Sequence, residues 1–218
     1  VDEDVASCAS CMMINDAHGN QVIGFYPGPD NPRRQSPETL PFIDNIVLTI
    51  LGPEEPELTL RQGRILFEHN VPLMVDPGQV ISAFSRDQIR ELLKLARYLV
   101  INHHEFEVLK TNGGLTDEEV FGQVPEVVLT RGDKGVAIYS GGGICNVDAV
   151  PDVKVDEVTG SGDAFRAGYA YGIVNNLNLT ERGQAGCIMA ARNLENPETQ
   201  RYRITATELD ALRTTIYG

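Results

Sequence analysis

Short runs of apolar, mostly β-branched residues alternate through the middle of the chain with stretches whose apolar residues recur at helical spacing. The apolar runs cover residues 46–51, 72–75, 98–101, 127–129 and 136–139, and another short strand ends at Val147. The stretches with helical spacing lie near residues 57–69, 86–97, 116–123, 163–176, 180–194 and 205–217. Almost continuously apolar strands separated by helices are typical of a parallel sheet covered on both faces. We therefore predict an α/β fold with a doubly wound, mainly parallel sheet and helices on both of its faces.

The N-terminal part of the chain has a different pattern. Residues 7–14 and 21–26 are strand-like and flank a polar turn, which predicts a β-hairpin. Five prolines within residues 27–41 then predict an irregular connection. We therefore divide the chain into a small β-hairpin at residues 1–28 and an α/β domain at residues 29–218.

Composition and charge exclude several classes of protein. With 218 residues, of which 42% are hydrophobic, the chain can bury a substantial core, which excludes wholesale disorder. No apolar run approaches the roughly 18 residues that a membrane-spanning helix needs, so we expect no membrane partner. The formal net charge of −13 argues against a nucleic-acid partner, because phosphate backbones are bound by clustered Lys and Arg. A small phosphorylated ligand is compatible with this charge, since a few local N–H groups and cations hold it.

The cysteines and histidines give no clear metal site. Cys8 and Cys11 form a C-x-x-C, which could be a metal or redox pair, but no second pair follows. His103 and His104 are adjacent and therefore point apart on any regular element. We interpret the cysteines as reduced thiols of a cytoplasmic protein.

Three of the predicted strands end at polar residues. Asp76, Asn102 and Thr130 each follow the last apolar residue of a strand directly. Ligands of open α/β sheets bind at the carboxyl edge of the strands. Loops are polar in general, so one such residue would indicate little. Three of them along one edge predict a binding crevice.

The densest candidate for chemistry is the segment from Glu157 to Gly172. Its residues 159–162 predict a tight turn, and a helix is expected to begin at about Asp163. The first N–H groups of a helix lack an internal acceptor and lie at the positive end of its dipole. Such an arrangement suits the charge on a phosphoryl group in transfer. Gly168 and Gly172 lie on one face of this helix and predict close packing against a neighbour.

Asp163 has two interpretations. It can be an N-terminal capping carboxylate, a common use of aspartate. It can also be a general base that accepts a proton from a substrate hydroxyl, late in a phosphoryl transfer. Competing motifs are missing: the chain has no P-loop, no third glycine of a dinucleotide fingerprint and no G-x-S-x-G elbow.

Several of these segments resemble one enzyme family. Residues 160–168, Gly-Ser-Gly-Asp-Ala-Phe-Arg-Ala-Gly, are similar to the second signature of the ribokinase-like (PfkB) carbohydrate kinases. Asn102-His-His-Glu105 resembles the N-x-x-E motif of that family, and residues 130–135 resemble its nucleotide-binding turn. Residues 25–28, 76–79 and 195–200 are most similar to the bacterial adenosine kinase branch. The resemblance extends over essentially the whole chain.

The resemblance implies a role for each matching residue. Asp163 would be the base that activates the substrate hydroxyl, with Gly160, Ser161 and Gly162 as the anion hole. Asn102 and Glu105 would organise Mg²⁺ and the phosphates, mainly through water. The residues that would line the phosphates and ribose of ATP are Thr130, Arg131, Gly132, Lys134 and Gly135. Phe25 would contact the nucleoside.

Two of these roles have a purely structural alternative, and two features depart from the family. Asn102 and Glu105 can be a helix N-cap with a first-turn acid, and Phe25 can pack beneath the hairpin. Glu157 stands where the family usually has Asp. The N-terminal segment of the family, which carries substrate contacts, has no match here. We therefore expect residues 29–218 to be an N-terminally incomplete nucleotide-binding kinase domain and residues 1–28 to be the remnant of a lid, through which a homodimer could form.

The leading hypothesis is an ATP- and Mg²⁺-dependent kinase that phosphorylates a primary hydroxyl of a nucleoside, first of all the 5′-hydroxyl of adenosine. One alternative is a kinase for ribose, fructose or a similar sugar. Another is a nucleotide-binding protein without transferase activity. A dehydrogenase is disfavoured by the missing third glycine.

Overall fold

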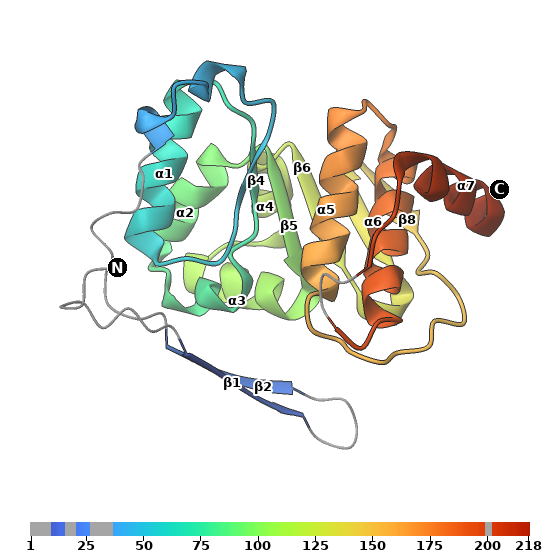
Figure 1. Cartoon of the computed structure of the whole chain (residues 1–218). Helices are drawn as coiled ribbons and strands as arrows, with labels where there is room; N and C mark the ends of the chain where they lie inside the picture. Colours follow the sequence, from blue (N-terminus) through green and yellow to red (C-terminus); the bar gives the residue numbers. More distant parts are fainter. Residues whose placement is uncertain (1–9, 16–20, 27–36, 199–201) are drawn as a thin grey trace.

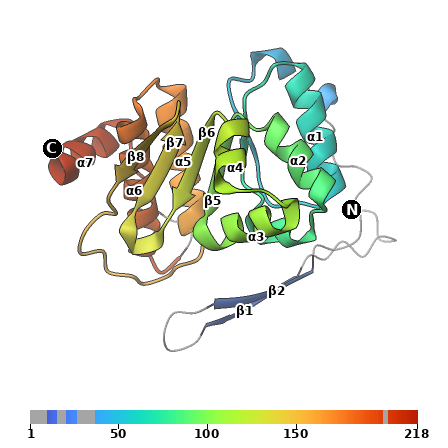
Figure 2. The same cartoon turned by 180° about the vertical axis from the view of Figure 1, so that it is seen from behind.

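The computed structural model describes residues 10–15, 21–26, 37–198 and 202–218. Its main body is a six-stranded sheet in the order β3-β4-β5-β6-β7-β8 (Figures 1 and 2). The strands are β3 (Thr49–Leu51), β4 (Leu73–Val75), β5 (Tyr98–Asn102), β6 (Glu126–Thr130), β7 (Val136–Ser140) and β8 (Gly143–Val147). Neighbours from β3 to β6 pair in parallel, whereas β7 pairs antiparallel with both β6 and β8. The predicted α/β fold with a mainly parallel sheet is confirmed.

Helices cover both faces of this sheet. One group consists of α1 (Pro56–Glu68), α2 (Arg86–Leu95), α3 (His103–Gly113) and α4 (Asp117–Gln123). The other group consists of α5 (Ser161–Val174), α6 (Leu179–Leu194) and α7 (Ala206–Tyr217), the last of which packs on α6. Within the described ranges, the 3₁₀ helices η1 to η4 cover Pro37–Thr39, Ile43–Asn45, Gly78–Ala83 and Gly132–Lys134.

The strands alternate their side chains between two apolar cores. Leu73 and Val75 of β4 join the core beneath α1 to α4, and Met74 between them joins the core beneath α5 and α6. This alternation follows from the period of two along a strand. Because both cores are apolar, the strands are apolar almost throughout, which is the pattern that predicted them.

Helices α5 and α6 pack closely, and α5 is the helix that begins in the candidate site. A methyl group on Gly168 would lie 2.4 Å from the carbonyl oxygen of Ala185, so glycine allows the two backbones to touch. The next residue of α5, Tyr169, donates its hydroxyl to the buried carboxylate of Glu126 over 2.7 Å. Arg182 of α6 pairs with the same carboxylate over 3.1 Å. The predicted close packing is confirmed, and it fixes α5 against the sheet.

Three differences from the predicted elements matter for the site. Helix α3 was not among the predicted helices, since few of its residues are apolar. Helix α5 begins at Ser161, two residues earlier than expected, which makes Gly160 its N-cap. The first strand of the sheet is limited to Thr49–Leu51, because residues 43–45 form a 3₁₀ turn and Val47 is exposed.

The predicted hairpin is present as strands β1 (Ser10–Asn15) and β2 (Gln21–Tyr26), paired antiparallel from Ser10–Tyr26 to Asn15–Gln21. It lies beyond the end of the domain at which α3 begins (Figures 1 and 2). The boundary at residue 28 stays a prediction and falls outside the described residues. In the described part of the chain, no helix has both the length and the apolar composition to cross a membrane.

The cysteine prediction is tested for two of the four residues. Cys145 and Cys187 are free thiols, as expected. Burial raises the pKa of Cys187 to about 11, so it is uncharged at neutral pH. Cys8 and the side chain of Cys11 lie outside the described residues.

Candidate active site at the carboxyl edge of the sheet

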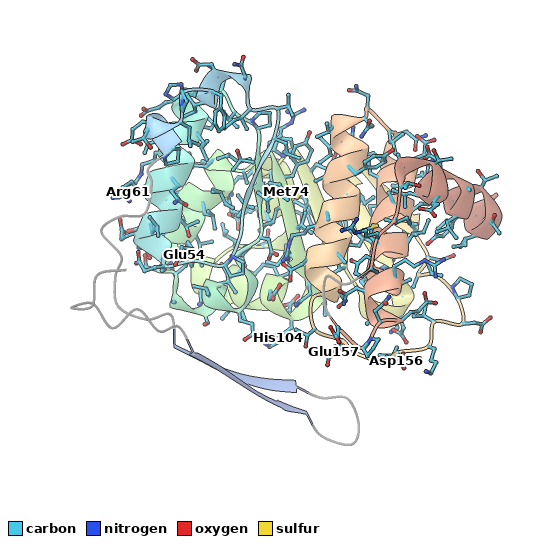
Figure 3. The ribbon with its side chains drawn as sticks, viewed as in Figure 1. Glu54, Arg61, Met74, His104, Asp156 and Glu157 are labelled. Carbon is cyan, nitrogen blue, oxygen red and sulfur yellow. The ribbon has the colours of Figure 1, made fainter. Side chains whose placement is uncertain are left out.

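The polar residues that follow the strands meet at one edge of the sheet. Asn102 at the end of β5 lies directly opposite Thr130 at the end of β6, and Asp76 follows the parallel strand β4. Figure 3 shows His104, at the start of α3, and Glu157, before α5, at this same end of the domain. The sequence-based expectation that these segments share an edge is confirmed.

The start of α5 lies over this edge and exposes backbone amides. Gly160 is in the left-handed region at φ +82°, where glycine is favoured, and turns the chain into the helix. The Ser161 N–H is used within the turn, since it donates to the Val158 carbonyl over 3.3 Å. Among the described residues, the amides of Gly162 and Asp163 have no backbone acceptor. These two amides are therefore the ones available to an anion at the positive end of the helix.

Glu157 holds the turn that precedes α5. Its Oε1 accepts the Thr159 N–H over 2.8 Å and the Thr159 hydroxyl over 2.7 Å. The backbone hydrogen bond from Thr159 is the main reason why the pKa of Glu157 is lowered. From α6, the side-chain amide of Asn193 donates to the Thr159 carbonyl over 2.8 Å. Glu157 thus has a structural role that its position in the sequence did not indicate.

A cavity of about 820 Å³ lies between the β6–β7 turn and the start of α5. Five residues that were predicted for the site line it: Thr130, Gly132, Gly135, Ser161 and Gly162. Asp133 of the predicted turn and Phe165 of α5 also line it, and the remaining lining, which was not predicted, comes from residues 148–158 and from α6, including Val150, Val155, Cys187, Ala190 and Leu194. Valines in an otherwise polar connection, with Val155 56% exposed, were the signal that could have indicated it. The cavity has an apolar wall and a wall of backbone groups, which suit the base and the phosphates of a nucleotide, and three aspartates, Asp133, Asp148 and Asp152, also line it.

Two residues of the predicted nucleotide-binding turn do not line this cavity. Arg131 directs its guanidinium to β8, where it donates to Asn146 Oδ1 over 3.0 Å. Lys134 ends the 3₁₀ turn η4 and lies outside the lining of the cavity. Gly135 is essential to the cavity wall, since a methyl group there would lie 2.1 Å from the Val147 carbonyl oxygen.

Asn102 and Glu105 form a capping box at the start of α3. Asn102 Oδ1 accepts the Glu105 N–H over 2.9 Å, and Glu105 Oε2 accepts the Asn102 N–H over 3.1 Å. This is the structural alternative weighed for the pair. Burial raises the pKa of Glu105, although its hydrogen bonds with Asn102 oppose the shift. Only one Glu105 oxygen belongs to the capping box, so the other can face a ligand.

The residues at this edge fit a divalent cation that keeps its waters. Among the described residues, no group of three or more His, Cys, Asp or Glu is placed to hold a metal ion. Mg²⁺ is usually held by one or two carboxylates, several waters and the phosphates of a substrate. Glu105, in the first turn of α3, supplies one carboxylate for such an arrangement at the edge where Asn102 lies opposite Thr130.

Asp163 occupies the first turn of α5 on the side that faces β4. Because Gly160 is the N-cap, Asp163 is the third helical residue and does not cap the helix. Its side chain is 75% exposed and pairs with Arg166, which also pairs with Asp76 after β4. The start of α5 thus lines the cavity through Ser161 and Gly162, whereas the Asp163 carboxylate next to them lies outside the lining and pairs with Arg166.

Comparison with known proteins identifies the family. The model of the PfkB family of carbohydrate kinases matches residues 1–205. The chain belongs to this family. It is 25% identical over 179 residues to a nucleoside kinase of Methanocaldococcus jannaschii, covering 82% of this chain and 58% of the relative. It is 26% identical over 195 residues to a nucleoside kinase of Methanothermobacter thermautotrophicus, covering 89% and 62%.

Solved structures agree with the PfkB assignment. The nucleoside kinase of Burkholderia thailandensis in complex with inosine has a TM-score of 0.85 at 28% identity, covering 96% of this chain and 70% of that one. An Arabidopsis thaliana ribokinase complexed with ribose and ATP has a TM-score of 0.74 at 19% identity, covering 94% and 68%, and thus shares the fold. The chain spans about 60% of the length of the two archaeal nucleoside kinases, 58% and 62% respectively.

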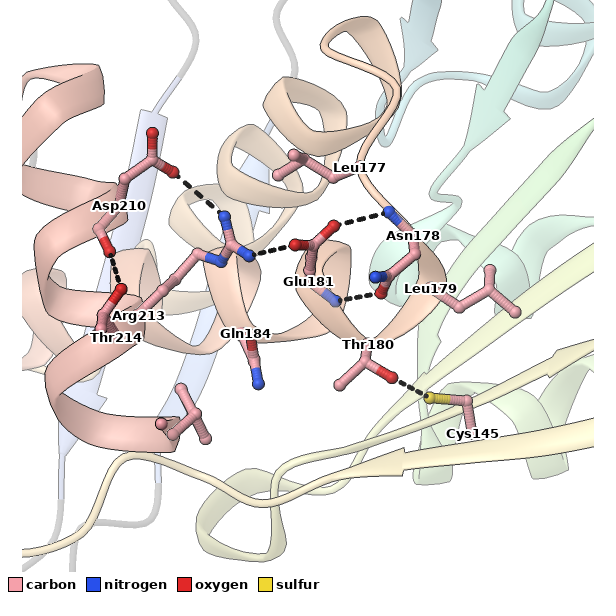
Figure 4. A pocket seen from close by; sticks show the side chains of 12 residues that line it. Cys145, Leu177, Asn178, Leu179, Thr180, Glu181, Gln184, Asp210, Arg213 and Thr214 are labelled. Atoms are coloured by element: carbon pink, nitrogen blue, oxygen red, sulfur yellow. Dashed lines mark hydrogen bonds and ion pairs between the residues drawn. The ribbon is translucent and has the colours of Figure 1, made fainter.

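Two other features of this PfkB-family chain lie outside the candidate site. Phe25 belongs to β2, but its side chain is outside the described part, so its predicted contact with a nucleoside stays a prediction. A pocket of about 1000 Å³ lies where α6 begins beside α7 (Figure 4). Its cation, Arg213, pairs with Glu181 and Asp210, over 2.8 and 3.0 Å. None of the predicted site residues lines this pocket.

Proposed function

We propose that this protein transfers a phosphoryl group from ATP to a hydroxyl group of a nucleoside. The observation that carries the proposal is the position of the α5 start between a nucleotide-sized cavity and the exposed carboxylate of Asp163. The nucleoside kinases among its relatives support a nucleoside as acceptor. The 5′-hydroxyl of adenosine is our first candidate. It rests on the resemblance of residues 25–28, 76–79 and 195–200 to bacterial adenosine kinases.

In this proposal, each group of site residues has a separate role in the reaction. The apolar wall from α6 and residues 148–158 would take the base, and the β6–β7 turn would contact the ribose and phosphates of ATP. The amides of Gly162 and Asp163 would hold the charge that builds on the γ-phosphoryl group. The Asp163 carboxylate would accept the proton of the acceptor hydroxyl as its oxygen bonds to phosphorus. Mg²⁺ would be held near Glu105, mainly through water, and would neutralise the charge on the phosphates.

Asp163→Asn tests the base. This substitution keeps the shape of the side chain but removes its basicity, so turnover should fall by about 10²–10⁴-fold. Binding of Mg·ATP, measured by calorimetry, should change little, because Asp163 does not line the cavity. If Asp163→Asn keeps most of its turnover, the assigned base is wrong.

A panel of acceptors tests the substrate class. Phosphate transfer from Mg·ATP should be measured with adenosine, inosine, other nucleosides, ribose and fructose in parallel. A nucleoside should give the highest kcat/KM. Preference for a free sugar would favour a ribokinase-like activity, in line with a 28% identical Lactococcus lactis ribokinase among the relatives. Mg·ATP binding without transfer to any acceptor would contradict the proposal.

A further inference from the structure

Arg166 of α5 connects two carboxylates at the carboxyl edge of the sheet. It pairs with Asp76 at the end of β4 and with Asp163 in the first turn of its own helix. The Arg166 side chain is 16% exposed and that of Asp76 is 2% exposed, whereas that of Asp163 is 75% exposed. Arg166 therefore links the buried carboxylate of Asp76 to the accessible carboxylate of Asp163.

The buried end of this connection is held by the backbone. Asp76 Oδ1 accepts the Gly78 N–H over 2.9 Å, and the Asp76 N–H donates to the Leu51 carbonyl over 2.9 Å. Gly78 lies at φ +51°, and a methyl group there would be 2.6 Å from Pro53. Asp76 is thus fixed by two segments of chain, and it is a firm partner for a cation.

Arg166 stays charged under working conditions. Burial lowers its pKa to about 10, which still leaves the guanidinium protonated near pH 7. A planar guanidinium can contact two carboxylates at once, since its donors form a rigid fork. The two ion pairs therefore restrict the orientation of Asp163, whose exposed side chain would otherwise rotate.

We propose that Asp76 and Arg166 form a positioning pair that holds the Asp163 carboxylate toward the acceptor hydroxyl. This inference rests on the proposed function, in which Asp163 is the base. In the reaction, the acceptor O–H bond breaks as its oxygen bonds to the γ-phosphorus, ADP leaves with the bridging oxygen, and the proton goes to Asp163. Arg166 exchanges no proton and acts only through Asp163. Misplacement of a reacting group by about 1 Å can cost about 10²-fold in rate.

Kinetics on the full chain test this role. In Arg166→Gln, kcat should fall by about 10²-fold, while KM for ATP and acceptor stays within about threefold. Arg166→Lys should recover part of the loss, because it restores the charge but not the fork. In an Asp163→Asn background, Arg166→Gln should change the residual rate by less than about threefold. The matched control is Arg64→Gln, which removes an exposed pair with Glu91 and should leave kcat unchanged.

Arg166→Gln leaves Asp76 buried without its cation, which can impair folding. The double variant Asp76→Asn/Arg166→Gln removes both charges and should fold, with the same loss of kcat. If either folded variant keeps the kcat of the wild type, the positioning role is refuted. If the rate losses of Arg166→Gln and Asp163→Asn multiply, Arg166 does not act through Asp163.

A measurement without turnover separates this inference from the proposed function. In ¹⁵N NMR spectra, the Arg166 guanidinium signals, assigned by their loss in Arg166→Lys, should shift in Asp163→Asn and in Asp76→Asn. Unchanged signals would mean that the contacts do not form in solution, and the inference would be refuted whatever the activity. If the signals shift but Asp163→Asn retains turnover, the base assignment fails, and the positioning role fails with it. If Asp163→Asn is inactive and Arg166→Gln is not, the function stands and the positioning role is wrong.

Discussion

Replacement of Gly135 by alanine tests how the cavity between the β6–β7 turn and the start of α5 is built. Gly135 has φ +77° and ψ −131°, a combination that is essentially restricted to glycine. A methyl group at this position would lie 2.1 Å from the Val147 carbonyl oxygen and 2.6 Å from the Ala149 amide nitrogen. Both are backbone atoms, so relief of the contact requires the chain after β8 to move. That chain forms one wall of the cavity.

The size of the effect follows from two costs. A residue held in an unfavourable φ/ψ region costs about 1–3 kcal/mol, and overpacking costs about 1–3 kcal/mol more. A total of about 4 kcal/mol should lower the Tm of a chain of this size by roughly 8–16 °C. Displacement of the cavity wall should also weaken Mg·ATP binding, by about tenfold for each 1.4 kcal/mol of misfit.

Gly142→Ala is the matched control for this experiment. Gly142 has the same φ of +77°, but nothing lies within 4 Å of the added methyl group. It therefore has the positive φ without the collision, and it does not line the cavity. Thermal denaturation by circular dichroism and calorimetry with Mg·ATP should be run on both variants. If the Tm of Gly135→Ala falls no further than that of Gly142→Ala, or if it binds Mg·ATP as the wild type does, the close approach of Gly135 to the chain after β8 does not determine the shape of the site.

Three further substitutions, one of them a control, test the helix pair and the capping box. Gly168→Ala should destabilise the protein by about 1–3 kcal/mol, because its methyl group meets a backbone carbonyl of α6. Gly122→Ala on α4 has open space, so it should be neutral or stabilising by up to about 1 kcal/mol in urea unfolding. Glu105→Gln keeps a capping box but removes the carboxylate. Because the pKa of Glu105 is raised in the folded protein, its ionised form lowers the stability of the fold at neutral pH. The Tm of this variant should therefore be unchanged or higher, while the Mg²⁺ concentration needed for half-maximal turnover rises; an unchanged Mg²⁺ dependence would leave Glu105 with the structural role alone.

The fold was predictable because its strands are buried on both faces. That burial makes β4, β5 and β6 apolar almost throughout, so that the polar residue that ends or directly follows each of them marks its carboxyl end. The antiparallel pairing of β6 with β7 can also be inferred from the sequence, since the five residues between the two strands cannot contain a crossover helix. Helix α3 was missed because its buried side chains are few and its start was analysed only as a possible cap.

The site was predictable where a motif is local and not where it depends on distant packing. Residues 130–135 and 160–163 are contiguous segments, so their turns and amides follow from glycine positions. The contact between Asp76 and Arg166 joins residues 90 positions apart, and it depends on which strand lies beneath α5. The motif predicted that Arg131 contacts the nucleotide. The antiparallel pairing of β7 with β8 instead places Asn146 where the Arg131 guanidinium donates a hydrogen bond to it. No periodicity along the chain encodes such pairings.

The acidic lining of the cavity, in a chain with a net charge of −13, limits how the proposed triphosphate ligand can bind. Asp133, Asp148 and Asp152 line the cavity, and among the described residues no Lys or Arg does. Carboxylates accept hydrogen bonds from hydroxyl groups, so the acidic lining suits a ribose, but it repels bare phosphates. The favourable groups for phosphate are the amides at the start of α5 and a cation that arrives with the nucleotide. On the proposed function, we therefore expect the nucleotide to bind as a metal complex, with its phosphates toward Gly162 and the neighbouring Asp163.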